Sequence, residues 1–177
     1  MPSPRSRSMS RHWLRMPELE RGVRLAIDVG SVRVGVARSD PDAVLAVPET
    51  TVQRDGMTIG AISELVQEYD VVRVYVGLPL SLGGSVGLAG EAAQKFAAEL
   101  AAQIDVPVYL VDERMSTVSA QRSLQDAGRT TRQTRSIVDQ AAAVVILEGA
   151  LYRERATGTP AGLEVTVVNR SGKEGTS

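Results

Sequence analysis

The feature that most constrains this fold is a pair of apolar runs on either side of one acidic residue, Asp28. Residues 25–27 lead into Asp28, Gly30 follows, and a second apolar run covers residues 34–37. Such runs, separated by a turn that contains glycine, are typical of a β-hairpin. A carboxylate at the end of a buried strand is costly unless a cation pairs with it. The sequence therefore predicts a hairpin with a metal ion, or a phosphate held by a metal ion, beside Asp28.

The composition limits the chemistry that is possible. The chain has 177 residues, enough for one domain with its own core, and 43% are hydrophobic but only 3% aromatic. It contains no cysteine and one histidine, His12. This excludes cysteine nucleophiles, disulfides and Cys–His zinc sites, and leaves almost no room for a histidine-based triad. Because Asp and Glu are plentiful, hard-metal chemistry on oxygen ligands remains.

The composition changes along the chain and predicts three segments. Residues 1–22 form a flexible basic arm, residues 23–155 the folded domain, and residues 156–177 a largely disordered tail. The first 24 residues hold six arginines against two acids, which is typical of a solvated tail or an RNA-contacting arm, and is shared with transit peptides. The apolar run at 163–168 is either an added edge strand or a sticky tail. No run approaches the roughly 18 apolar residues of a membrane span, so no membrane partner is expected.

Within the domain, the hydrophobic pattern predicts alternating strands and helices. Continuous or alternating apolar runs predict strands at 23–28, 33–38, 43–52, 71–78 and 106–111, and Pro48 marks the third as an edge or irregular strand. Helical spacing predicts helices at 57–69, 88–104 and 133–155, and a further one that starts at Ser116 or Thr117 and ends before Gly128. The expected fold is α/β, with a mixed five-stranded sheet flanked by helices.

Three acidic residues lie where this fold could bring them together. Asp28 ends the first strand, Glu113 follows the strand at 106–111, and Asp139 is the last polar residue before the closing helix becomes apolar. Phosphodiester hydrolysis needs an activated water and neutralised phosphate charge, which two Mg²⁺ ions roughly 3.5–4 Å apart supply when carboxylates hold them. The three residues together indicate a magnesium-dependent nuclease site.

Each acid also has a purely structural explanation. Asp28 could form a turn with Gly30, and Glu113 could pair with Arg114 or cap the next helix. Asp139 could pair with Arg135, one helical turn earlier. Asp112 also competes with Glu113, because successive strand residues face opposite sides and the sequence does not show which side carries the site.

Four motifs in order carry a resemblance to a known family. They are Asp28-Val29-Gly30-x-x-Arg33-x-Gly35-Val36-Ala37, Val76-Gly77-Leu78-Pro79-Leu80, Val111-Asp112-Glu113-Arg114-x-Ser116-Thr117 and Val138-Asp139-x-x-Ala142-x-x-x-Ile146-Leu147. Over residues 23–155 the chain resembles the YqgF/RuvX family of pre-16S ribosomal RNA nucleases, which are also described as Holliday junction resolvase-like.

The resemblance implies an RNase H-like fold, and it implies that Asp28, Glu113 and Asp139 are catalytic and hold Mg²⁺ or Mn²⁺. It also implies a cytoplasmic enzyme that trims the 5′ end of the 16S ribosomal RNA precursor. Two positions depart from the family: Val32 stands where lysine is frequent, and Ser81 where asparagine is usual. Both bear on substrate contacts and leave the three acids intact.

Backbone amides of the glycine-containing loop at 77–85 could approach a phosphate, or the loop could be a plain connection between strand and helix. The arginines near the motifs could bind phosphates or form ordinary surface ion pairs. The predicted substrate-binding residues are Arg33, Gly77, Pro79, Ser81, Arg114, Arg132 and Arg135.

Other functions share parts of this pattern. A DNA junction resolvase would use the same chemistry on branched DNA, and a non-catalytic RNA-binding or transcription-associated module would bind without turnover. An ATP-binding phosphotransferase is a third possibility, because Asp28 and Gly30 also match a phosphate hairpin, although such proteins clamp nucleotide between two domains. The expected partner is nucleic acid, either structured precursor RNA or branched DNA. The chain would be a monomer or a homodimer, and no dimer face is evident.

Overall fold

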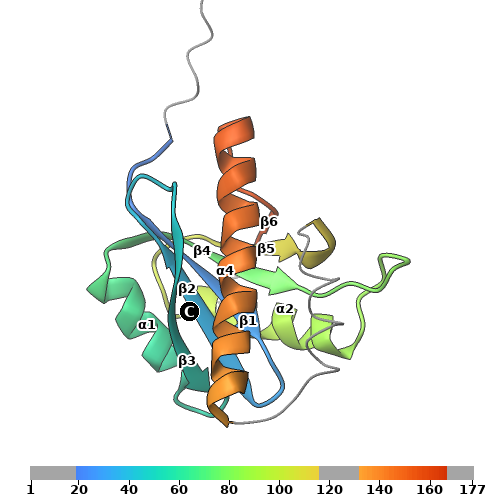
Figure 1. Ribbon diagram of the computed structural model, residues 1–177. Coiled ribbons are helices and arrows are strands. Elements are labelled where there is room, and N and C mark those ends of the chain that lie inside the picture. Colours follow the sequence, from blue (N-terminus) through green and yellow to red (C-terminus); the bar gives the residue numbers. More distant parts are fainter. Residues whose placement is uncertain (1–18, 116–131, 167–177) are drawn as a thin grey trace, which may run out of the picture.

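The computed structural model describes residues 19–115 and 132–166, and side chains within 19–114 and 138–166. Its centre is a six-stranded mixed sheet in the order β3-β2-β1-β4-β5-β6 (Figure 1). The strands are β1 (Val23–Val29), β2 (Arg33–Ser39), β3 (Ala46–Gln53), β4 (Val71–Leu78), β5 (Val108–Asp112) and β6 (Leu163–Glu164).

The predicted hairpin is confirmed, because β1 and β2 pair antiparallel through the turn that contains Gly30. Strand β4 has the predicted bounds and lies between β1 and β5, parallel to both. Its continuous apolar run fits this position, since a central parallel strand is covered on both faces. Strand β3, which contains Pro48, lies at the edge of the sheet as predicted.

The predicted number of five strands is wrong, because β6 adds a sixth strand. It pairs antiparallel with β5, with Leu163 opposite Leu110 and Glu164 opposite Tyr109. Gly162, at φ +84°, turns the chain onto β5, where a Cβ would overlap the carbonyl oxygen of Leu110. Of the two possibilities for the run at 163–168, the structure therefore has the added edge strand at Leu163–Glu164.

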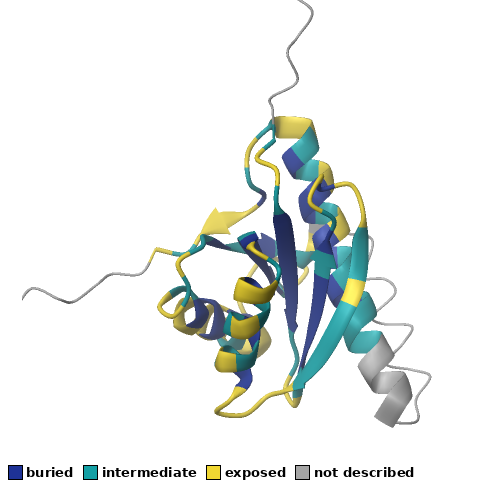
Figure 2. Cartoon of the chain, turned by 90° about the vertical axis from the view of Figure 1, so that its left-hand side faces the viewer, coloured by how far each residue is buried: buried dark blue, intermediate teal, exposed yellow. Residues whose placement is uncertain are grey.

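Helices cover both faces of the sheet (Figure 2). Helices α1 (Thr58–Glu68) and α2 (Leu88–Ala101) lie on one face, and the long helix α4 (Arg132–Thr157) lies across the other. A short 3₁₀ helix, η1 (Glu113–Met115), follows β5. The helix predicted between Ser116 or Thr117 and Gly128 lies outside the described residues. Within 19–115 and 132–166, the structure has no helix that is long and apolar enough to cross a membrane.

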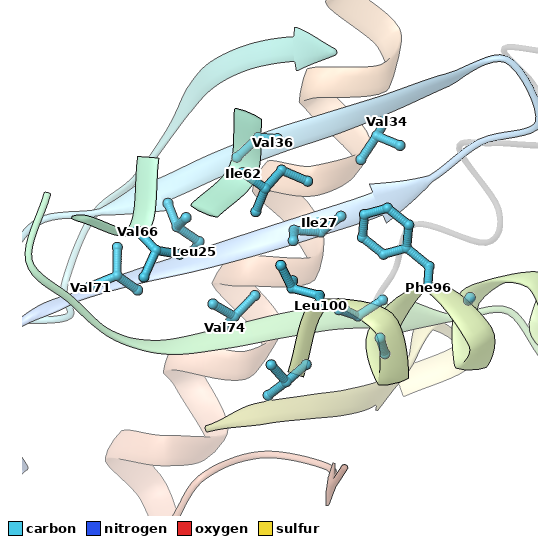
Figure 3. Close-up of a cluster of buried hydrophobic side chains, with 14 of the residues drawn as sticks. Leu25, Ile27, Val34, Val36, Ile62, Val66, Val71, Val74, Phe96 and Leu100 are labelled. Atoms are coloured by element: carbon cyan, nitrogen blue, oxygen red, sulfur yellow. The ribbon is translucent and has the colours of Figure 1, made fainter. Parts of the chain in front are cut away.

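The two faces of the sheet carry different residues. Large aliphatic side chains such as Leu25 and Ile27 point toward α1 and α2, where they pack on Ile62, Phe96 and Leu100 (Figure 3). The face under α4 contains a second cluster, in which β1 and β2 contribute the small residues Ala26 and Ala37 and α4 contributes Ala143 and Leu147. Small residues let the helix backbone come close to the strands, which brings the polar groups of α4 within reach of the sheet.

A buried group of charged residues anchors the C-terminal half of α4. Glu154 accepts hydrogen bonds from Arg24 Nη2 at 2.8 Å and Tyr75 Oη at 3.0 Å, and a third from Arg73 Nη1. Arg24 and Glu154 are 0% and 1% exposed. Arg24 therefore belongs to the interior, although it adds to the positive charge of the N-terminal sequence. Burial raises the pKa of the Tyr75 hydroxyl well above its ordinary value, and the nearby Glu154 carboxylate raises it further.

Candidate active site

Asp28 lies near the end of β1 on the face that α4 covers. It stands directly opposite Gly35 of β2, and the preceding alternate pair, Ala26 and Ala37, contacts the α4 cluster. Alternate residues of a strand point to the same face, and directly opposite residues of an antiparallel pair share that face. Asp28 therefore points to the same side of the sheet as these alanines. It is 4% exposed. A carboxylate is thus placed among small residues close to the helix.

Two glycines flank Asp28 in the sheet. Gly35 is its partner in β2, and Gly77 of β4 is its neighbour on the other side, one residue beyond the pair of Ile27 with Val76. A Cβ at Gly35 would overlap the backbone of Asp139. A Cβ at Gly77 would lie 2.5 Å from Glu113 Oε1 and 2.6 Å from Ile146 Cδ1. The other two acids therefore lie above the two glycines that border Asp28.

The structure distinguishes Glu113 from Asp112. Glu113 is the first residue of η1, and its carboxylate lies over Gly77, between β4 and α4. Asp112 instead accepts hydrogen bonds from Arg114, at 2.7 Å from Nη2 and 2.9 Å from the backbone amide. The Arg114 side chain holds the pKa of the Asp112 carboxyl below its usual value. Of the two neighbouring acids, Glu113 is the one beside Asp28.

Asp139 comes from the N-terminal half of α4, at 24% exposure of its side chain. Its Oδ2 accepts a hydrogen bond of 2.7 Å from Arg33 Nε of β2, a partner that the sequence did not suggest. The side chain of Arg135, which the sequence offered as a partner, lies outside the described residues. The next residue, Gln140, donates to Thr51 Oγ1 of β3 at 3.2 Å, which ties the helix to the edge of the sheet.

The three acids suit a divalent metal by their chemistry, because carboxylate oxygens are the ligands that Mg²⁺ and Mn²⁺ prefer. The space above Gly77, which a Cβ would fill, also admits the Glu113 carboxylate. Over the residues that the structure describes, however, no three Asp, Glu, His or Cys side chains are grouped closely enough to hold an ion. One oxygen of Asp139 is directed to Arg33. A shared ion therefore requires the three side chains to come closer together.

The other predicted substrate-binding residues occupy several positions. Gly77 is buried, and Pro79 is half-buried at the exit of β4. Ser81 closes the loop onto Ser85: its amide donates to the Ser85 carbonyl at 2.9 Å, and the two hydroxyls lie 2.6 Å apart. Because the amide of Ser81 is used within the loop, the loop geometry does not present it to a phosphate. Arg114 lies against this loop, with Nη1 3.5 Å from the Ser81 carbonyl oxygen.

Two predicted arginines and one unpredicted arginine complete the surroundings. Arg132 and Arg135 belong to the first turn of α4, and their side chains fall outside the described part of the chain. Arg54, which belongs to none of the sequence motifs, follows β3 and donates to the Gly30 carbonyl at 2.8 Å. No local pattern identifies Arg54, because its contact depends on how the β1–β2 turn and the end of β3 come together.

Comparison with known families identifies the relatives of this chain. The model of the family described as "RuvX: Holliday junction resolvase" matches residues 22–153, which include all three acids. The chain belongs to the RuvX family.

Several curated RuvX relatives match most of the chain. A protein of Streptomyces coelicolor is 48% identical over 86% of this chain and 93% of its own length. One from Nocardioides sp. is 53% identical over 80% and 94%, and one from Mycobacteroides abscessus is 50% identical over 78% and 86%. All three are called "Putative pre-16S rRNA nuclease".

A solved structure supports the fold of this RuvX member. RuvC of T. thermophilus, in complex with a Holliday junction substrate, matches with a TM-score of 0.50 and 16% identity, and the match covers 78% of this chain and 98% of that chain. At this identity the likeness concerns the fold alone. The predicted RNase H-like α/β class is confirmed, with six strands in place of five.

Proposed function

We propose that this RuvX member is a metal-dependent nuclease that hydrolyses phosphodiester bonds and trims the 5′ end of the 16S ribosomal RNA precursor. The names of the relatives at 48–53% identity support this substrate. The sequence motifs support the reaction, since Asp28, Glu113 and Asp139 are all present. A ribosomal RNA substrate would place the protein in the cytoplasm.

One observation carries the proposal. Asp28 lies between two glycines, and each glycine leaves room for one of the other acids: Gly35 for the backbone of Asp139, and Gly77 for the carboxylate of Glu113. This arrangement supports the proposal, because residues that are far apart in the sequence lie on the same face of the sheet. Close packing against a strand normally favours a side chain, so two glycines that border a buried acid favour a role in the site.

Asp28, Glu113 and Asp139 would hold Mg²⁺ or Mn²⁺, and the metal would activate a water molecule and neutralise charge on the phosphate. The protein's own residues would position the metal and the substrate. Asp28 is fixed by the strand, so its oxygens need little ordering when a ligand binds. Arg33 is bonded to Asp139, and Arg114 lies against the loop at Ser81. Both would contact backbone phosphates, since guanidinium groups match phosphate geometry.

The test is cleavage of a precursor RNA by the purified protein with Mg²⁺ or Mn²⁺. Asp28→Asn should lower the rate at least about a hundredfold, because even partners of metal ligands typically contribute 10–100-fold. The control is Asp105→Asn, which makes the same change at an exposed position. Circular dichroism would show that both variants stay folded. Unchanged cleavage by a folded Asp28→Asn variant would eliminate the proposal.

The description of the matched family favours a second candidate, a junction resolvase acting on branched DNA. The same acids would serve, because both substrates present phosphodiesters to the metal. Parallel reactions on precursor RNA and on a four-way DNA junction, at equal salt and metal, separate the two. RNA affinity without metal-dependent turnover on either substrate would instead indicate a non-catalytic binding module.

A further inference from the structure

The pair between Arg33 and Asp139 involves one of the three acids of the proposed site. Nε of Arg33 donates to Oδ2 of Asp139 at 2.7 Å, and the two side chains are 17% and 24% exposed. Both side chains are therefore mostly buried but still in contact with solvent. A charge-assisted hydrogen bond of this length competes directly with any other cation for the same carboxylate.

The backbones on both sides of this pair are fixed. The carbonyl of Arg33 accepts a hydrogen bond of 2.9 Å from the Gly30 amide, which closes the β1–β2 turn. The backbone of Asp139 is pressed against Gly35, where even a Cβ would not fit. Neither α-carbon can move far without breaking the hairpin or lifting α4. Any exchange of partners must take place in the two side chains alone.

Arg33 also differs from the neighbouring arginines in what it holds. Arg54 is bound to the backbone of the turn, and Arg114 makes several hydrogen bonds to Asp112. Arg33 instead donates a hydrogen bond from Nε to Asp139, a residue that the proposed function needs as a metal ligand. Among the described side chains, its guanidinium is paired with Asp139.

We propose that Arg33 is an exchangeable counter-ion: it neutralises Asp139 in the metal-free protein, and it turns to a phosphate of the nucleic acid once metal occupies that carboxylate. This inference rests on the proposed function. The anchored backbone keeps the released guanidinium next to the site, where its planar fork suits a phosphate. Arg33 would thus couple metal binding to substrate binding, because each frees a group that the other needs.

The first test is Mn²⁺ binding without nucleic acid, by calorimetry, for the full chain and its variants. Arg33→Gln removes the competitor and should bind Mn²⁺ about tenfold more tightly, as expected when one hydrogen bond to a charged group is lost. Arg33→Lys, which keeps the charge but loses the fork, should lie between the two. The matched control is Arg38→Gln on the same strand, whose partner is Glu49, and it should leave Mn²⁺ affinity unchanged.

The second test is affinity for a short RNA, with and without Ca²⁺ in place of Mn²⁺ so that the RNA stays intact. The unmodified protein should gain affinity when Ca²⁺ is added, and Arg33→Gln should lose most of that gain. Mn²⁺ affinity in Arg33→Gln that is equal to or weaker than in the unmodified protein would overturn the inference.

Asp139→Asn distinguishes a failure of the exchange at Arg33 from a failure of the proposed metal site. If it weakens Mn²⁺ binding while Arg33→Gln does not strengthen it, the exchange at Arg33 is wrong and the metal site stands. If the unmodified protein does not bind Mn²⁺ at all, the proposed metal-dependent function fails, and the exchange fails with it.

Discussion

Helix α4 is tied to the sheet by arginine–carboxylate contacts at both of its ends, and the two ends differ in almost every respect. Toward the C-terminus, Glu154 is 1% exposed and is surrounded by donors from Arg24, Arg73 and Tyr75. About 22 Å away along the helix, at a rise of about 1.5 Å per residue, Asp139 is partly exposed and accepts a hydrogen bond from Arg33. At the C-terminal contact, the Glu154 carboxylate has several donors and is closed to solvent. At the N-terminal contact, the Asp139 carboxylate is accessible enough to exchange its hydrogen-bond partner.

The difference shows how one element can serve both stability and function. A buried carboxylate with several donors cannot change partners without leaving charges unpaired in the interior. A part-exposed carboxylate can exchange a donor at small cost. The C-terminal contact would therefore hold α4 in place, so that Asp139 can change partners without movement of the helix. Four variants test this contrast.

The largest effect is expected at the buried end. Glu154→Ala leaves Arg24 charged in the interior without a carboxylate and leaves Arg73 with Glu20 as its carboxylate partner, and should lower the free energy of unfolding by about 3–5 kcal/mol. Urea denaturation measures this change. Glu148→Ala on an exposed turn of the same helix should change it by less than about 0.5 kcal/mol. A loss below about 1 kcal/mol for Glu154→Ala would mean that the buried group does not anchor α4.

A second, smaller effect is expected where α4 touches the sheet beside Asp28. Gly35→Ala places a Cβ against the Asp139 backbone and should lower the free energy of unfolding by about 1–3 kcal/mol through overpacking. Gly60→Ala is the matched control, because nothing lies within 4 Å of a Cβ at that exposed position in α1. It should stabilise the chain by about 0.5–1 kcal/mol. If Gly35→Ala stabilised the chain as Gly60→Ala is expected to do, the close approach at Gly35 would be refuted.

A third effect compares the two ends directly. Asp139→Asn removes the charge from the part-exposed pair and should change the free energy of unfolding by less than about 1 kcal/mol. Thermal and urea unfolding, run beside Glu154→Ala, provide the comparison. A cost for Asp139→Asn that equals the cost for Glu154→Ala would make both pairs structural, and would remove the basis for an exchange at Asp139.

The sequence could predict elements with a local pattern, but not contacts between distant residues. The hairpin and β4 were predictable, because their apolar runs are long and periodic. Strand β6 could be given only as one of two possibilities, since its two residues are exposed and it is held by backbone pairing with β5. The motifs predicted the three acids as a site, but the contact of Asp139 with Arg33 could not be predicted, because the two residues are 106 positions apart in the sequence.

The position of Glu154 in the sequence is itself a signal of a buried ion pair. It lies three residues after Leu151 and four after Ala150, which places it on the buried stripe of α4. A charged residue on such a stripe predicts a buried partner of opposite charge. Its partners, Arg24 and Arg73, are contributed by β1 and β4, and only the order of the strands brings them together.

The smallest effect concerns Asp112, the acid that lies next to Glu113 without joining Asp28. Hydrogen bonds from Arg114 lower its pKa, so the pair is intact above the ordinary carboxyl value of 3.8 and is lost as the pH falls through the lowered pKa. Arg114→Gln should therefore raise the midpoint of Asp112 toward 3.8, as measured by an NMR titration of its carboxyl carbon. Asp40 is the internal control, because backbone amides at Leu45 and Val44 lower its pKa and Arg114 takes no part. If the midpoint of Asp112 stayed unchanged, something other than Arg114 would hold its charge, and Asp112 would return as a rival of Glu113 for the metal.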